Sequence, residues 1–202
     1  MAASRDYVNR KLHSLLGVIP LGVFLIQHLT VNHFATRGAE AFNAAAHFME
    51  TLPFRYVLET LVIFLPLLFH GIYGVYISFQ AKNNVSRYGY FRNFMFLLQR
   101  ITGIIALIFI TWHVWQTRVQ AQFGADVNYD MMANILASPI AVVLYLIGVI
   151  SVIFHFSNGL WSFFVSWGLT VTPRSQKLFS YVTMAIFVAL SIVGIRAIFA
   201  FI

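Results

Sequence analysis

The amino-acid sequence predicts an all-α membrane protein with five transmembrane helices, and three observations support this fold class. Of the 202 residues, 60% are hydrophobic and only 9% are charged, whereas a soluble globular domain carries roughly 25% charged residues. The mean hydropathy is +0.80. Uncharged stretches that approach the roughly 20 apolar residues needed to cross a bilayer recur along the chain. These observations exclude an ordinary soluble enzyme, a disordered chain and a free nucleic-acid-binding protein.

The stretches free of Lys, Arg, Asp and Glu define the expected spans in order: Leu12–Thr36, Thr60–Ala81, Ile101–Thr117, Met131–Pro173 and Leu178–Ile195. The third extends backward over Asn93–Gln99, and the fourth is long enough for one extended helix over Ile140–Trp167, bounded by a proline at each end. Pro20 and Pro66 lie inside the first two spans, where neighbouring helices can tolerate a kink. The connections are short, so we expect one membrane domain over residues 1–202.

The basic residues predict how the chain is oriented, because five spans place its termini on opposite sides of the membrane. Nine Lys and Arg residues lie on the side of the N-terminus: Arg5, Arg10, Lys11, Lys82, Arg87, Arg92, Arg100, Arg174 and Lys177. The opposite side has four: Arg37, Arg55, Arg118 and Arg196. The positive-inside rule therefore puts the N-terminus in the cytoplasm and the C-terminus outside the cell membrane. We therefore interpret the net charge of +7 as a determinant of membrane orientation and of the surface that faces a partner, and not as a sign of nucleic-acid binding.

The composition also limits the chemistry. The chain has no Cys, which excludes disulfides, thiolate ligands, iron–sulfur clusters and covalent haem attachment within it. Aromatic residues make up 17% of the chain, with 21 Phe. This content suits dense packing or a flat aromatic cofactor.

Four histidines inside the expected spans follow a repeat. His28 precedes His70 by 42 residues. His113 precedes His155 by the same 42 residues, so the second pair repeats the first at an offset of 85. A glycine pair and three phenylalanine pairs keep that offset. We interpret the repeat as two helical hairpins, spans one and two and spans three and four, related by a pseudo-twofold axis along the membrane normal.

Helix geometry places these histidines at two depths. With a rise of about 1.5 Å per residue, His113 lies roughly 8 Å below the outer surface, and His28 is similarly close to the outer end of its span. His70 and His155 lie roughly 15–23 Å below that surface. A four-helix bundle of the two hairpins would face each pair across its centre, with the fifth helix at the periphery.

Two neutral imidazoles facing one another can hold a six-coordinate haem iron, and this arrangement suits an electron carrier because it leaves no open position for oxygen. The pattern therefore predicts two stacked haems, one held by His28 and His113 and the other by His70 and His155, roughly 10–15 Å apart along the normal. Glycines in the same spans would let the backbone recede from a flat ring: Gly17, Gly22, Gly71, Gly74, Gly103 and Gly159.

Other interpretations of the histidines exist. A single intramembrane His can be a hydrogen-bond partner between helices. A divalent-metal transporter is an alternative function, although zinc needs three or four ligands at about 2.1 Å from one ion and the two depths disfavour such a site. The cytochrome of bc complexes places two histidines on one helix, whereas here each lies on a different span. His33 and His47 have no mate in the repeat and are expected at the outer surface.

Five segments carry a family resemblance: Leu12–Pro20, Gln27–Leu29, His70–Gly74, Trp112–Trp115 and His155–Trp161. They closely resemble the two-haem cytochrome b subunits of succinate:quinone oxidoreductases, particularly those of Gram-positive bacilli. The resemblance implies a membrane anchor for a flavoprotein and an iron–sulfur subunit on the cytoplasmic side, with haem b on the same two histidine pairs. It also implies electron transfer from succinate to a quinone, menaquinone in bacillus-like relatives. The same architecture serves fumarate reductases that run in the reverse direction.

With this resemblance, quinone reduction is expected near the outer histidine pair. The candidate quinone residues are polar groups at the outer ends of the first three spans: Gln27, Thr30, His33, Glu59 and Gln116. Glu59 is notable as a lone carboxylate just inside the second span, where it would be costly, although an acid there could also cap a helix N-terminus. The candidate residues for binding a haem propionate lie near the cytoplasmic side: His13 and Arg100.

Overall fold

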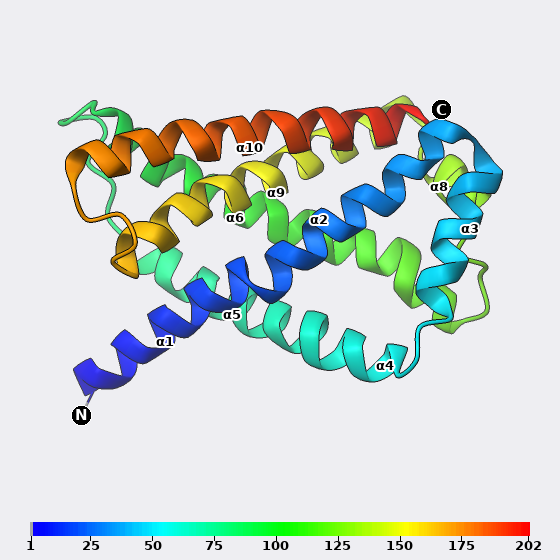
Figure 1. Cartoon of the computed structure of the whole chain (residues 1–202), viewed down its shortest axis with the longest axis horizontal. Helices are drawn as coiled ribbons and strands as arrows, with labels where there is room; N and C mark the ends of the chain where they lie inside the picture. Colours follow the sequence, from blue (N-terminus) through cyan, green and yellow to red (C-terminus); the bar gives the residue numbers. More distant parts are fainter. Residues whose placement is uncertain (1) are drawn as a thin grey trace.

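The computed structural model describes residues 2–202, and over that range it contains helices and no strand. Five of its helical stretches are long and apolar enough to cross a membrane: Arg5–Arg37, Arg55–Gln80, Phe91–Gln122, Pro139–Ser166 and Pro173–Phe199. The two termini lie at opposite ends of the bundle (Figure 1). The predicted all-α class and the five spans are therefore confirmed. We call the two ends of the bundle the N-terminal end and the C-terminal end, after the terminus that each carries.

Prolines interrupt the first two spans, as expected. The first consists of α1 (Ala2–Val18), α2 (Pro20–His33) and the 3-10 turn η1 (Phe34–Arg37). The second consists of α4 (Arg55–Leu58), the π-helix η2 (Glu59–Phe64) and α5 (Leu65–Gln80). Proline lacks the N–H that an α-helix needs from each interior residue, so α2 and α5 each carry their proline in the first turn.

The third and fifth spans are longer than predicted, whereas the fourth has the predicted length. The third runs through α6 (Phe91–Val114), the π-helix η3 (Trp115–Val119) and the short α7 (Gln120–Gln122). The fourth is α9 (Pro139–Ser166) and the fifth is α10 (Pro173–Phe199). A capping box between Thr172 and Ser175 starts α10 before its apolar part begins, which explains why a search for uncharged stretches placed this helix too late.

The first connection is not short, which corrects the prediction. It holds the helix α3 (Ala39–Glu50), and the third connection holds α8 (Tyr129–Ile135). Both lie at the C-terminal end of the bundle (Figure 1). On α3, Phe42 and Ala46 are buried one turn apart, so this helix covers the bundle with one apolar face.

A cluster of buried residues lies under this cover. It joins α3, α8, the C-terminal segment and the start of α9 through these residues: Ala35, Phe42, Ala46, Met132, Leu136, Tyr145, Ile198 and Phe201. Apolar side chains elsewhere along the spans face outward, as Ile72 and Ile108 do with 65% and 66% exposure. Exposed apolar surface in the middle of a span is what lipid contact requires.

The helices pack as the repeat predicts. Within the hairpins, α1 contacts α5 and α6 contacts α9. Helix α10 packs against α9 and α2 along one side of the bundle (Figure 1). The fifth helix is therefore peripheral, as expected.

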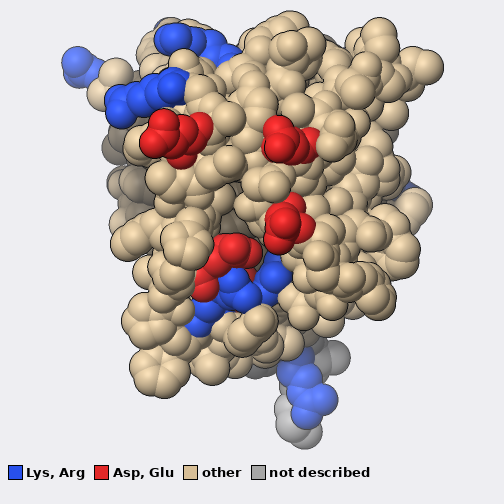
Figure 2. All heavy atoms as spheres, turned by 90° about the vertical axis from the view of Figure 1, so that its right-hand side faces the viewer, with Lys and Arg blue, Asp and Glu red and all other residues tan. Residues whose placement is uncertain are grey.

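Charge is distributed unevenly between the two ends. Among the acidic residues, only Asp6 belongs to the N-terminal end, where it pairs with Arg10 at 2.8 Å. The other five belong to the C-terminal end: Glu40, Glu50, Glu59, Asp126 and Asp130. Figure 2 shows acidic side chains gathered over that end, with basic side chains between some of them. The N-terminal end, with nine Lys and Arg residues, is thus strongly cationic.

Candidate functional site

The four repeated histidines come together as two pairs. The ring centroids of His70 and His155 are 6.0 Å apart, with the ring planes at 86°. Those of His28 and His113 are 5.8 Å apart, with the planes at 73°. Two imidazoles that bind one iron from opposite sides would have centroids roughly 6 Å apart, given metal–nitrogen bonds of about 2.0–2.1 Å. The pairing inferred from sequence depth is therefore also the pairing in space.

His70 lies in a notch on the first span. Its Nδ1 is 2.9 Å from the carbonyl oxygen of His13, and a Cβ placed on Gly17 would collide with its ring. Gly17 lies one helical turn after His13. His13 thus supplies the hydrogen-bond acceptor, and the absence of a side chain on Gly17 makes room for the His70 ring.

His155 lies in the corresponding notch on the third span. Its Nδ1 is 3.0 Å from the carbonyl oxygen of Gln99, and a Cβ on Gly103 would lie 2.9 Å from its Cε1. The two notches follow each other at an offset of 86 residues, one more than the histidines themselves. The glycines therefore make room for the imidazole rings, which refines the expectation that they recede from a flat ring.

The hydrogen bonds decide which ring nitrogen is free. A backbone carbonyl can only accept, so the Nδ1 atoms of His70 and His155 must carry their protons. The lone pair of each neutral ring is then on Nε2, the nitrogen left for a metal. Such a partner is the usual support of a metal-binding histidine, because it fixes both tautomer and ring orientation.

The second pair is held differently. The Nδ1 of His113 is 3.2 Å from the hydroxyl of Tyr145, which donates to Oε1 of Gln116 at 3.1 Å. Asn32 Nδ2 lies 3.4 Å from Nε2 of His28 and donates at 2.9 Å to the carbonyl oxygen of that same histidine. The shorter bond holds the Asn32 amide to the backbone.

A phenylalanine accompanies each histidine of this pair four residues earlier in the chain. The ring centroids of Phe24 and His28 are 5.4 Å apart, and those of Phe109 and His113 are 5.8 Å apart. The phenylalanines are themselves 85 residues apart. The contact between a phenylalanine and a histidine is therefore repeated in both halves of the second pair.

Of the two candidate propionate residues, His13 contacts the first pair directly, and Arg100 lies next in the chain to a residue that does. The His13 ring stacks on the His70 ring with centroids 4.0 Å apart and planes at 9°. Its Nδ1 is buried without a hydrogen-bond partner, and so is Nε of Arg100. Arg100 follows the residue whose carbonyl oxygen faces His155. Both nitrogens are thus buried polar atoms without a partner among the described residues.

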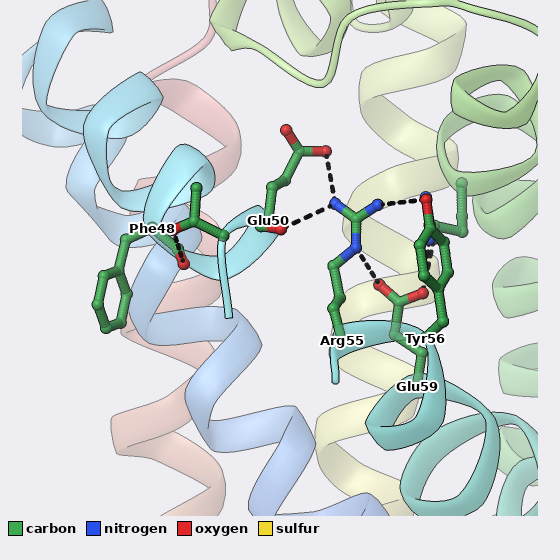
Figure 3. Close-up of polar contacts among 7 residues, drawn as sticks. Phe48, Glu50, Arg55, Tyr56 and Glu59 are labelled. Atoms are coloured by element: carbon green, nitrogen blue, oxygen red, sulfur yellow. Dashed lines mark hydrogen bonds and ion pairs between the residues drawn. The ribbon is translucent and has the colours of Figure 1, made fainter. Parts of the chain in front are cut away.

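Glu59 is not a lone carboxylate, which corrects the prediction. Its Oε2 accepts from Arg118 on the third span at 2.6 Å, and its Oε1 is 3.9 Å from Nε of Arg55. Arg55 also reaches Glu50 at the end of α3, with 3.5 Å between the charged atoms (Figure 3). An ion-pair cluster thus connects α3 with the second and third spans at the C-terminal end. The sequence does not reveal it, because Glu59 and Arg118 are 59 residues apart.

The other quinone candidates do not form one cluster. Gln27 Nε2 lies 3.0 Å from Sδ of Met49, and the Thr30 hydroxyl donates to the Ile26 carbonyl oxygen at 2.8 Å. His33 Nδ1 is buried without a partner. Within residues 2–202, no hydrogen bond or ion pair joins any two of the five candidates: Gln27, Thr30, His33, Glu59 and Gln116.

Comparison with known proteins shows the family of this chain. Residues 83–194 match the family described as succinate dehydrogenase/fumarate reductase transmembrane subunit. The chain is 67% identical over 202 residues to the succinate dehydrogenase cytochrome b558 subunit of Bacillus subtilis (strain 168), and the match covers the whole of both chains. This chain therefore belongs to the family of succinate dehydrogenase/fumarate reductase transmembrane subunits.

Proposed function

We propose that this chain is the membrane-anchor and electron-transfer subunit of a succinate:quinone oxidoreductase and holds two haems b. The name of the Bacillus subtilis relative supports haem b as the cofactor. The observation that carries the proposal is the pairing of the histidines, with centroids 6.0 and 5.8 Å apart at two levels of one bundle. When bound between two imidazoles, haem supplies one-electron chemistry with no open position for oxygen.

The residues of this chain would hold and orient the two groups. His70 and His155 present Nε2 because carbonyl oxygens hold their Nδ1 protons. His113 does so because the Tyr145 hydroxyl oxygen accepts a hydrogen bond from its Nδ1–H, and His28 completes that pair. His13 and Arg100 would donate to a propionate beside the first pair. A transporter would need three or four ligands converging on one ion, whereas the described residues contain no group of three or more His, Asp or Glu side chains that could hold a metal ion.

Turnover of the complex tests this function. In the purified complex with its partner subunits, succinate is expected to reduce the haem absorption, and a menaquinone analogue is expected to reoxidise it. If dithionite reduces the haem but succinate does not, the chain does not connect succinate to quinone. Comparing succinate oxidation with fumarate reduction in the same preparation shows which direction the complex favours.

The cationic N-terminal end is proposed as the cytoplasmic face that binds the flavoprotein and iron–sulfur subunits. Lys82 and Arg87 lie exposed in the connection between the second and third spans. Neutralising both in a Lys82→Gln/Arg87→Gln variant should weaken retention of the partner subunits by about 2- to 30-fold, if each exposed charge contributes about 0.2–1 kcal/mol. Retention on the tagged membrane subunit at increasing salt measures the effect.

Arg196→Gln is the matched control, because Arg196 is an exposed basic residue of the opposite end. It should leave retention unchanged. Partner subunits cross-linked beside Asp126 and Asp130 would refute the proposed sidedness.

We also infer that residues 1–202 act as one membrane domain, because the five spans pack against one another without a break.

Quinone, proposed as menaquinone, is expected to react at the C-terminal end beside the His28–His113 pair. A shallow, open apolar groove lies at that end between α2, η1 and α3, with Phe34 and Met49 in its lining. Gln27 reaches the same Met49.

Glu59→Gln and His33→Ala should each lower succinate-to-quinone activity by at least about tenfold, a smaller effect than that of a full general acid. Reduction of an artificial acceptor at the partner subunits should be unchanged. Glu40→Gln, which removes another carboxylate of the same end that forms no ion pair, is the matched control. Full quinone activity in both variants, or an inhibitor bound only beside His70, would show that the site lies elsewhere.

A further inference from the structure

Tyr145 is the most deeply buried aromatic hydroxyl among the described residues. It lies on α9 and is 2% exposed, within the buried cluster at the C-terminal end. Its ring contacts Phe109 and Trp112, with centroids 5.2 Å away in each case. A buried tyrosine needs a partner for its hydroxyl group, and the choice of partner shows what the residue does.

The partners of this hydroxyl form a chain across two helices. The Tyr145 hydroxyl has one hydrogen to donate, and it donates this hydrogen bond to Oε1 of Gln116 at 3.1 Å. Toward His113, 3.2 Å away, the oxygen can therefore only accept. Nδ1 of His113 must carry a proton, and Nε2 is left with its lone pair. Tyr145 thus selects the tautomer in which His113 can bind a metal through Nε2.

We propose that Tyr145 is a positioning residue for the haem held by His28 and His113, and that together with Gln116 it sets the reduction potential of that haem separately from the other. This inference rests on the proposed function. The Nδ1 atoms of His70 and His155 bind backbone carbonyl oxygens, which no substitution can remove. Among His70, His155 and His113, only His113 has a side chain as the hydrogen-bond partner of its Nδ1.

The physical effect follows from ligand basicity. A hydrogen bond accepted from Nδ1–H raises the electron donation of the imidazole and so favours the oxidised iron. In a Tyr145→Phe variant the ring shape is kept but the acceptor is lost, and the buried N–H of His113 has no partner. Supporting residues of this kind typically alter metal affinity by about 10–100-fold. A tenfold change in preference between the two oxidation states corresponds to about 59 mV for one electron.

Potentiometric titration of the intact complex tests the inference. In Tyr145→Phe, the midpoint of the His28–His113 haem should rise by an amount corresponding to about a tenfold change, about 59 mV. The midpoint of the His70–His155 haem should not move. Gln116→Leu should give a smaller rise of the same sign, because it leaves the tyrosine hydroxyl beside His113 but removes the acceptor of its proton.

Tyr129→Phe is the matched control. Its hydroxyl donates to the Ala200 carbonyl oxygen at 2.5 Å, in the same part of the molecule, and has no contact with a ligand histidine. Equal shifts of both haems in Tyr145→Phe, or the same shift in Tyr129→Phe, would assign Tyr145 to packing alone and overturn the inference. If Tyr145→Phe does not assemble, an unmoved midpoint in Gln116→Leu overturns it.

The haem content of the unmodified complex and of His113→Ala separates this inference from the proposed function. If the complex holds two haems and His113→Ala removes one, while Tyr145→Phe moves neither midpoint, the inference alone is wrong. If the unmodified complex lacks a haem that depends on His113, the proposed function fails, and the inference fails with it.

Discussion

A complex with His28→Ala is expected to contain one haem per membrane subunit instead of two and to keep the haem between His70 and His155. Loss of a supporting residue alone typically lowers metal affinity by about 10–100-fold, so loss of the ligand itself should leave its haem unbound. Succinate-to-quinone activity should fall by at least about tenfold, since quinone is proposed to react beside this pair. The haem-to-protein ratio and the reduced-minus-oxidised spectrum measure the result.

His47→Ala is the control for this experiment. His47 is an exposed histidine of α3 with no mate in the repeat, so its loss should change neither haem. An unchanged spectrum in His28→Ala, or equal loss of both haems, would contradict the assignment of His28 to one of two separate sites.

Gly103→Val is expected to remove or displace the haem between His70 and His155 and to leave the other in place. A Cβ at this position would lie 2.9 Å from Cε1 and 3.1 Å from Nδ1 of His155, closer than side chains tolerate. The ring would have to leave the notch and lose the carbonyl oxygen of Gln99. Such overpacking typically costs about 1–3 kcal/mol, which displacement of the ring can relieve. The spectrum of the reduced complex distinguishes the two haems.

Gly89→Val separates this effect from a general loss of stability. A Cβ on Gly89 has nothing within 4 Å, so the substitution should leave both haems bound. If Gly103→Val keeps both haems with unchanged spectra, the notch on the third span does not hold His155 in the complex.

Much of the fold and the histidine pairing could be predicted from the sequence. Membrane spans can be recognised in the sequence as uncharged stretches, because an unpaired charge inside the bilayer is energetically costly. The offset of 85 residues related His28 to His113 and His70 to His155 before any coordinates, since a repeat fixes both depth and face. The pairs then met in space as expected.

The notches were harder to foresee. Gly17 and Gly103 are conspicuous in the sequence, but their offset is 86 residues, one more than that of the histidines they face. Only a comparison that allowed the two offsets to differ would have connected them. Their contact with the ligands depends on how each helix is rotated, which composition does not determine.

The contacts at the C-terminal end could not be predicted for a different reason. The distance in sequence between His113 and Tyr145 is 32 residues, and the apolar pattern of α9 marks no single face, because lipid and protein surround it. The helix α3 was missed because the search was for whole spans, whereas this helix buries only one side. The ion pair of Glu59 with Arg118 joins charges that flank two separate predicted spans.

The haem-to-protein ratio of the purified, dithionite-reduced complex tests the central claim most directly. Two pairs of imidazoles at two levels predict two haems b for each copy of this chain, with two distinguishable midpoints in a redox titration. A ratio of one haem per chain, or a ratio of two that survives substitution of each of the four histidines singly, would contradict the account.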